Sequence, residues 1–176
     1  LVTLGFDGAK SGDHTALVGC EVETGHLFTL GVWDPEDYDG EAPRSAIHGA
    51  VERAYRGEPV PADCALWADA VRAAVLLACG PQDWRAERSF AHRLGYGGKL
   101  DLHSDEWVVD IKTKDGDPTG QPVYDEHLMQ LAAYRRGIGA HQARCGIVFV
   151  SRDEPAAAFV EAPAGETVDV FEAMKN

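Results

Sequence analysis

The 176-residue sequence predicts an α/β fold with a mixed sheet. Two observations carry this prediction. From residue 63 onward the chain reads as a helix, three short strands, a helix, two strands and a final helix, an order typical of a small α/β domain. Before residue 57, three apolar-rich runs are followed by a helical pattern, which indicates a β-meander plus one helix. Because residues 1–56 are few for an independent core, we expect them to pack on the rest.

The first part of the chain alternates apolar runs with polar connections. Strands are expected over residues 1–8, 15–22 and 26–33, and the last two are joined by a short hairpin link that contains Gly25. After a polar loop, Pro43 suits the first turn of a helix that runs to residue 56. The apolar residues of this helix recur at helical spacing, at Ile47, Val51, Ala54 and Tyr55.

The second part begins after a proline-rich break at residues 57–61. A helix is expected over residues 63–79, and its apolar residues Leu66, Ala70, Ala73, Ala74 and Leu77 fall on one face. The remaining expected elements are strands over 86–92, 97–103 and 107–112, a loop over 114–123, a helix over 124–137, strands over 145–151 and 157–162, and a helix over 166–175. The helix over 124–137 starts with acidic and ends with basic residues, as the helix dipole favours.

The charge balance restricts the function. Sixteen Lys and Arg against 29 Asp and Glu give a net charge of −13. Such a chain is not expected to coat nucleic acid or an anionic membrane by bulk attraction, although an enzyme whose acidic residues hold metal ions is compatible with it. No apolar run reaches the ~18–20 residues of a membrane helix, and no signal peptide is expected at the N-terminus.

Three charged residues in neighbouring strands are the strongest chemical signal. Strand alternation places Asp110 and Lys112 on one face, and antiparallel pairing of the two strands can bring Asp101 beside Asp110. Two close carboxylates repel each other unless a divalent cation lies between them, and oxygen ligands favour Mg²⁺ or Mn²⁺. A nearby lysine can orient a water molecule or stabilise a phosphate, which suits phosphodiester hydrolysis. A solvated ion pair at the strand ends is the alternative.

The motifs around these residues resemble those of the PD-(D/E)XK nucleases, in particular the RecB-like and phage-type exonucleases. The matching segments are Gly95-Tyr-Gly-Gly-Lys-Leu-Asp101, Val109-Asp-Ile-Lys-Thr113 and Gln130-Leu-Ala-Ala-Tyr134. The resemblance covers residues 63–176 and implies a restriction-endonuclease-like core.

The same resemblance implies a role for individual residues. Asp101 and Asp110 would be metal ligands, the carbonyl of Ile111 would complete the metal shell, and Lys112 would be the catalytic lysine. Gln130 and Tyr134, four residues apart on a helix, would face the site and the DNA, unless they simply belong to a partly buried helix face. The same family often has a ligand or base near the position of Glu87, for which a solvated strand end is an equal alternative. Lys99 and Lys114 flank the cluster and are candidates to hold phosphates.

Residues 1–56 resemble a different family. The segment from Leu4 to Ala16, with Asp7 after the first strand, is similar to the start of the RNase H-like nuclease domain of phage large terminase subunits. That resemblance makes Asp7 an alternative metal ligand, whereas a simple turn at Asp7-Gly8 would need no metal. We therefore divide the chain into a terminase-like segment, 1–56, and a nuclease core, 63–176.

These patterns lead to one favoured function and two alternatives. We expect a Mg²⁺- or Mn²⁺-dependent deoxyribonuclease of phage or prophage origin, located in the cytoplasm of a bacterial host, with DNA as its partner and no membrane association. A second copy of the chain, or a phage recombination or packaging protein, is a further possible partner. The alternatives are a terminase-type endonuclease that uses Asp7, and a non-catalytic DNA-binding module that keeps a nuclease fold.

Overall fold

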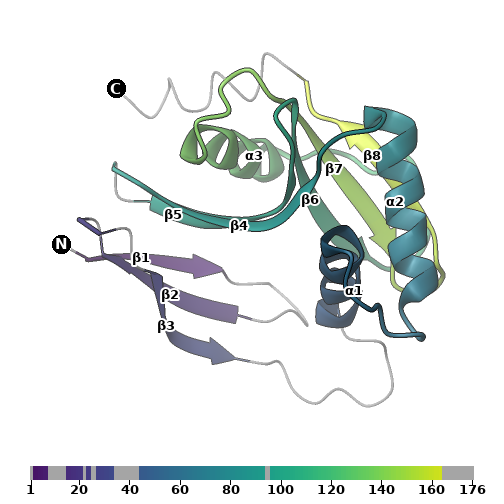
Figure 1. The fold of residues 1–176 in the computed structure, drawn as a ribbon, viewed down its shortest axis with the longest axis horizontal. Helices are drawn as coiled ribbons and strands as arrows, with labels where there is room; N and C mark the ends of the chain where they lie inside the picture. Colours follow the sequence, from purple (N-terminus) through teal and green to yellow (C-terminus); the bar gives the residue numbers. More distant parts are fainter. Residues whose placement is uncertain are drawn as a thin grey trace.

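A computed structural model of the chain describes residues 2–7, 15–21, 23–24, 27–33, 44–93 and 96–163. It contains two sheets and three helices within these ranges. The first sheet has the order β1 (Val2–Asp7), β2 (Thr15–Glu21) and β3 (Leu27–Trp33), and all its pairs are antiparallel. The predicted meander is therefore confirmed. Strand β1 lies against β5 of the second sheet (Figure 1).

The second sheet has five strands in sequence order. They are β4 (Arg85–His92), β5 (Tyr96–His103), β6 (Trp107–Lys114), β7 (Arg144–Ser151) and β8 (Ala157–Glu161). Only β6 and β7 pair in parallel, over the whole length from Trp107↔Arg144 to Lys114↔Ser151. Parallel neighbours need a crossover connection, and the helix α3 (Asp125–Gly137) lies in it. The sheet is therefore mixed, as the sequence predicts, and β6 is its central strand.

Helices cover both faces of the second sheet (Figure 1). α1 (Arg44–Arg56) and α2 (Ala65–Cys79) pack on one face, and α3 packs on the other. The core under α1 and α2 includes Ile47, Val51, Val71, Val75, Val109, Ile111 and Val148. The core under α3 includes Phe90, Leu100, Val108, Leu128, Leu131 and Ile147. Since Val108, Val109 and Ile111 alternate between the two cores, β6 is buried on both faces.

The buried face of α2 differs from the face that the sequence singles out. The helix buries Ala68, Val71 and Val75, whereas Leu66 is 63% exposed and Leu77 is 90% exposed. Both faces of α2 are apolar, and the sequence pattern alone does not say which of them meets the sheet.

The α/β fold with a mixed sheet is thus the observed one. The predicted helix over residues 166–175 lies outside the described residues. Among the residues that the structure describes, no helix is long and apolar enough to cross a membrane.

Candidate functional site

The site lies where β5 separates from β6. The two strands pair only at Leu102↔Val109 and His103↔Val108. Beyond this point the side chain of Asp101 takes the place of a backbone partner on β5, because its Oδ2 accepts a hydrogen bond from the backbone N–H of Ile111 at 2.7 Å. The opening between the strands therefore holds the carboxylate of Asp101 next to the following part of β6.

The β4–β5 hairpin changes its side-chain alternation at the same point. Residues two apart in a strand normally share a face, yet Leu102 packs in the α1/α2 core and Leu100 packs in the α3 core. On β4, Glu87 lies between the paired positions Ala86↔Leu102 and Arg88↔Leu100 and has a backbone φ of 59°. For a non-glycine residue, this left-handed backbone conformation raises the conformational free energy by about 1–2 kcal/mol. Such strain is concentrated at functional sites, and here it accompanies the turn of Asp101 towards β6.

Asp110 is a buried carboxylate. Its side chain lies on the α3 face of β6, and the residue is 3% exposed. Burial raises its pKa to about 6, and the neighbouring carboxylate of Asp101 raises it as well, against the opposing effect of Lys112. Its Oδ2 forms an ion pair with Nζ of Lys112 at 3.1 Å. A carboxylate that is buried beside a second carboxylate is costly, so this pair is suited to a bound cation.

Lys112 is linked to two further predicted residues, directly to Gln130 and through it to Tyr134. Its Nζ donates a hydrogen bond to Oε1 of Gln130 at 2.9 Å, and Nε2 of Gln130 donates to the hydroxyl oxygen of Tyr134 at 2.6 Å. The four-residue spacing on α3 places both side chains towards β6. The structure therefore brings Asp110, Lys112, Gln130 and Tyr134 into one row from the central strand to the helix.

Gly98 makes room for this row. A Cβ atom at this position would lie 2.9 Å from Cε1 of Tyr134 and 3.1 Å from Cε1 of Phe90. The rings of Phe90 and Tyr134 pack edge to face, with centroids 6.1 Å apart. Glycine at position 98 therefore allows the close approach of α3 to β5.

The remaining predicted residues lie around the row. Lys99 forms an ion pair with Glu87, whose side chain is 10% exposed. Nζ of Lys114 bonds to Oε1 of Gln121 and so links the end of β6 to the following loop. The side chain of Asp7 lies outside the described residues.

Sequence reasoning missed His48. Its Nδ1 lies 4.0 Å from Oδ1 of Asp101, so α1 contributes an imidazole to the site from the opposite side of the sheet. No short motif around His48 could have indicated this, since the contact joins residues 53 positions apart. His127 is also close to the row: burial lowers its pKa, and the charge of Lys112 lowers it further.

A metal ion would find two carboxylates here, from Asp101 and Asp110. In the described ranges no three His, Cys, Asp or Glu side chains are grouped with the spacing of a metal site. The carbonyl of Ile111, the other predicted ligand of β6, is a backbone group and would add a further oxygen donor. Mg²⁺ commonly uses only one or two carboxylates and keeps several waters, so this donor set fits it.

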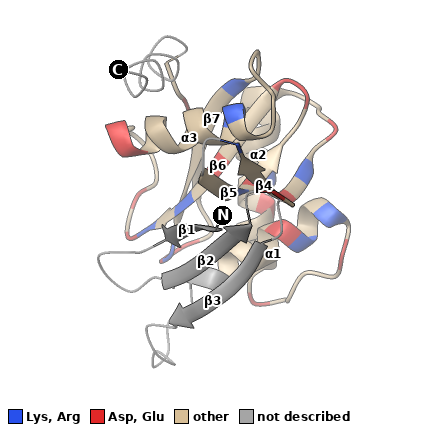
Figure 2. Cartoon of the chain, turned by 90° about the vertical axis from the view of Figure 1, so that its left-hand side faces the viewer, with Lys and Arg blue, Asp and Glu red and all other residues tan. Residues whose placement is uncertain are grey.

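Charges of both signs surround the site. In Figure 2, red and blue segments are interspersed over the coloured helices and strands, and the first turn of α3 is acidic. A polyanion would therefore be held at particular lysines and at a bound cation, rather than by a broad basic surface.

Comparisons with known proteins give one clear similarity. Over 54 residues the chain is 56% identical to the Gene 13 protein of Mycobacterium phage D29 and 54% identical to the Gene 13 protein of Mycobacterium phage L5. The chain is related to phage proteins. Each match covers 31% of this chain and only 9% of the phage protein, so the similarity concerns one segment of a much longer relative.

The other comparisons add little. No protein-family model matches the chain. The crystal structure of SSO0001 is similar over 59% of this chain and 53% of that chain, with 21% identity and a TM-score of 0.32. A similarity at that level carries no argument about fold or function.

Proposed function

We propose that the protein is a metal-dependent deoxyribonuclease that hydrolyses DNA phosphodiester bonds at the site on β5, β6 and α3. The observation that carries the proposal is the position of Lys112. Its Nζ lies 3.1 Å from Oδ2 of the buried Asp110 and 2.9 Å from Oε1 of Gln130, next to a second carboxylate. The motif resemblance to PD-(D/E)XK nucleases supports this function, and the similarity to phage proteins supports a phage origin.

The residues of the chain have distinct roles in this proposal. Asp101 and Asp110 would hold Mg²⁺ or Mn²⁺, which supplies positive charge beside a phosphate and makes a water molecule more acidic. Lys112, fixed between two partners, presents its ammonium group to the phosphate as negative charge develops. Gln130 and Tyr134 hold Lys112 in place and offer polar groups to the DNA backbone. His48 orients the carboxylate of Asp101 from the side of α1.

Cleavage of linear DNA tests the proposal. We expect degradation with Mg²⁺ or Mn²⁺ and none with EDTA. Asp110→Asn and Lys112→Ala should each lower the rate by about 100-fold or more, because stabilisation of developing charge is the largest catalytic contribution. Matched controls are Asp83→Asn, whose carboxylate is 90% exposed, and Arg53→Ala on the exposed side of α1; both should cleave like the wild type.

The same assay separates the alternatives. DNA binding without cleavage at any metal concentration would indicate a non-catalytic module. Full activity in Lys112→Ala would show that another part of the chain performs the reaction, and loss of activity in Asp7→Ala would favour the terminase-type site.

A further inference from the structure

His127 lies on the same face of α3 as Gln130 and Tyr134. It precedes them by three and seven residues, and these intervals correspond to about one and two turns of the helix. The residue is half-buried in the first turn of α3. The helix therefore directs a third polar side chain, besides those of Gln130 and Tyr134, towards β6.

The pairing of β6 with β7 places this imidazole beside Lys112. The ring centroid of His127 lies 6.0 Å from that of Phe149. Phe149 is the register partner of Lys112, and both side chains point to the α3 face of the sheet. Since neighbouring strands are about 4.8 Å apart, the imidazole lies over the strand next to Lys112.

A hydrogen bond fixes the position of the proton on this imidazole. The backbone N–H of Tyr124 donates to Nδ1 of His127 at 3.3 Å. A ring nitrogen that accepts a hydrogen bond carries no proton, so the ring is neutral and its one proton is on Nε2. Burial lowers the pKa of His127 and the charge of Lys112 lowers it further, which also favours the neutral ring.

We propose that His127 is a further catalytic residue of this site, whose Nε2–H donates a hydrogen bond to a non-bridging oxygen of the phosphate that Lys112 contacts. The proposal rests on the proposed nuclease function. Within the described part of the chain, Nε2 of His127 has no hydrogen-bond partner of its own. Its proton stays on the ring throughout, and the hydrogen bond becomes stronger as negative charge develops on the phosphate oxygens.

The contacts of Lys112 explain why a second donor is useful here. An ammonium group has three hydrogens, and Nζ of Lys112 already faces Oδ2 of Asp110 and Oε1 of Gln130. At most one hydrogen therefore remains for a phosphate. A neutral imidazole adds a donor beside Lys112, whereas a charged one would repel the ammonium group and lose the hydrogen bond from the amide of Tyr124.

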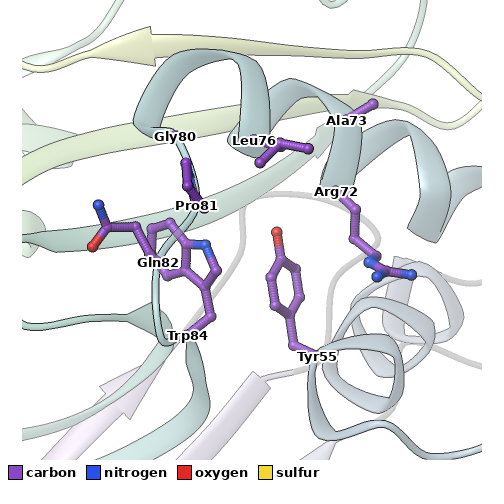
Figure 3. A pocket seen from close by; sticks show the side chains of 8 residues that line it. All are labelled: Tyr55, Arg72, Ala73, Leu76, Gly80, Pro81, Gln82 and Trp84. Atoms are coloured by element: carbon purple, nitrogen blue, oxygen red, sulfur yellow. The ribbon is translucent and has the colours of Figure 1, made fainter.

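A pocket on the opposite face of the sheet is separate from this site. It has a volume of about 430 Å³ and lies between α1, α2 and the segment from Gly80 to Trp84 (Figure 3). Its lining includes Tyr55 and Arg72, and none of its lining residues belongs to β6, β7 or α3. A phosphate at Lys112 would therefore meet the donors of β6 and α3, without the guanidinium group of Arg72.

Three substitutions separate the donor at Nε2 from the acceptor at Nδ1. His127 is the third residue of the helix, where a Gln or Glu side chain can accept a hydrogen bond from the amide of Tyr124. His127→Gln therefore keeps both an acceptor and a donor, His127→Glu keeps the acceptor alone, and His127→Ala keeps neither. The control is His141→Ala, since His141 is exposed in the turn after α3.

Steady-state cleavage of linear DNA with Mn²⁺ ranks these variants. We expect His127→Ala and His127→Glu to lower kcat by about 10- to 100-fold, the range for one hydrogen bond to a charged group, with little change in KM. His127→Gln should retain most of the wild-type rate, and His141→Ala should match the wild type.

A purely structural role for His127 predicts a different order. If the side chain only stabilised the start of α3, Glu would restore the rate as well as Gln does, because both close the capping box. Equal rates for these two variants, or a wild-type rate in His127→Ala, would overturn the proposal while the nuclease function stands.

The tautomer provides a test that does not depend on cleavage. In ¹⁵N NMR spectra of the full chain with and without Mg²⁺, the His127 signals are assigned from their absence in His127→Gln. They should show a proton on Nε2 and none on Nδ1. A proton on Nδ1 would overturn the proposal. A wild type that has the expected tautomer but cleaves no DNA would contradict the nuclease function itself, and with it this role of His127.

Discussion

Asp101 takes the place of a ladder partner for Ile111. Its Oδ2 accepts the hydrogen bond of the Ile111 amide at 2.7 Å, at the point where the pairing of β5 with β6 stops. One carboxylate therefore closes the open end of the ladder and faces the neighbouring Asp110. The hydrogen bond to the Ile111 amide needs only an oxygen acceptor at position 101. Binding a cation together with Asp110 would need a negative charge there.

Variants of Asp101 separate these two tasks. In Asp101→Asn the amide oxygen can still accept the hydrogen bond, so we expect a free energy of unfolding close to that of the wild type without metal. Asp101→Ala leaves the amide of the buried Ile111 without its acceptor and should lower that free energy by about 1–3 kcal/mol. Both should lose cleavage. Urea unfolding measures the difference, and equal destabilisation by Asn and Ala would contradict this role of the hydrogen bond.

Asp110→Asn should change the response of stability to metal. Without a divalent cation the substitution removes a buried negative charge beside Asp101, so we expect the melting temperature to rise. With Mn²⁺ the wild type should gain stability, because a ligand that binds only the folded state stabilises it, while the variant should gain little. Differential scanning calorimetry with and without Mn²⁺ measures both effects. A wild type that does not respond to Mn²⁺ would count against the metal site.

Glu87 allows a test of backbone strain. At an ordinary strand position glycine is less stable than alanine by about 0.5–1 kcal/mol. At Glu87, where φ is 59°, the order should be reversed, because only glycine adopts this conformation without a steric penalty. We expect Glu87→Gly to be more stable than Glu87→Ala by about 1 kcal/mol in urea unfolding. A more stable alanine variant would mean that the left-handed conformation is absent.

Gly98→Ala should disturb the row of residues next to Lys112. The added methyl would lie 2.9 Å from the ring of Tyr134, so the ring must move and its bond with Gln130 is lost. We expect a loss of about 1–3 kcal/mol in the free energy of unfolding and a slower cleavage rate. Gly49→Ala on α1 is the control, since nothing lies within 4 Å of the added atom there, and this change should stabilise the helix. Equal effects of the two substitutions would contradict the packing argument.

The sequence predicts most of the fold because its elements have strong local signals. The alternation in β6 places Asp110 and Lys112 on one face, and the four-residue spacing places Gln130 and Tyr134 together on α3. These signals depend only on the repeat of one strand or one helix. The predicted arrangement of these four side chains therefore agrees with the observed distances.

The features that the sequence does not reveal depend on long-range packing. His48 reaches Asp101 only because α1 packs across the sheet. The left-handed conformation of Glu87 has no sequence signal, because glycine or asparagine would be expected there. For α2, both sides of the helix are apolar, and the choice between them follows from the shape of the sheet and of α1 rather than from the periodicity.

The most direct measurement is the cleavage rate of linear DNA with Mn²⁺ for the wild type, Lys112→Ala and Asp7→Ala, compared in one experiment. We expect metal-dependent cleavage by the wild type, a loss of about 100-fold or more in Lys112→Ala, and a rate close to that of the wild type in Asp7→Ala. Cleavage that survives Lys112→Ala, or that disappears in Asp7→Ala, would contradict the assignment of the active site to β5, β6 and α3.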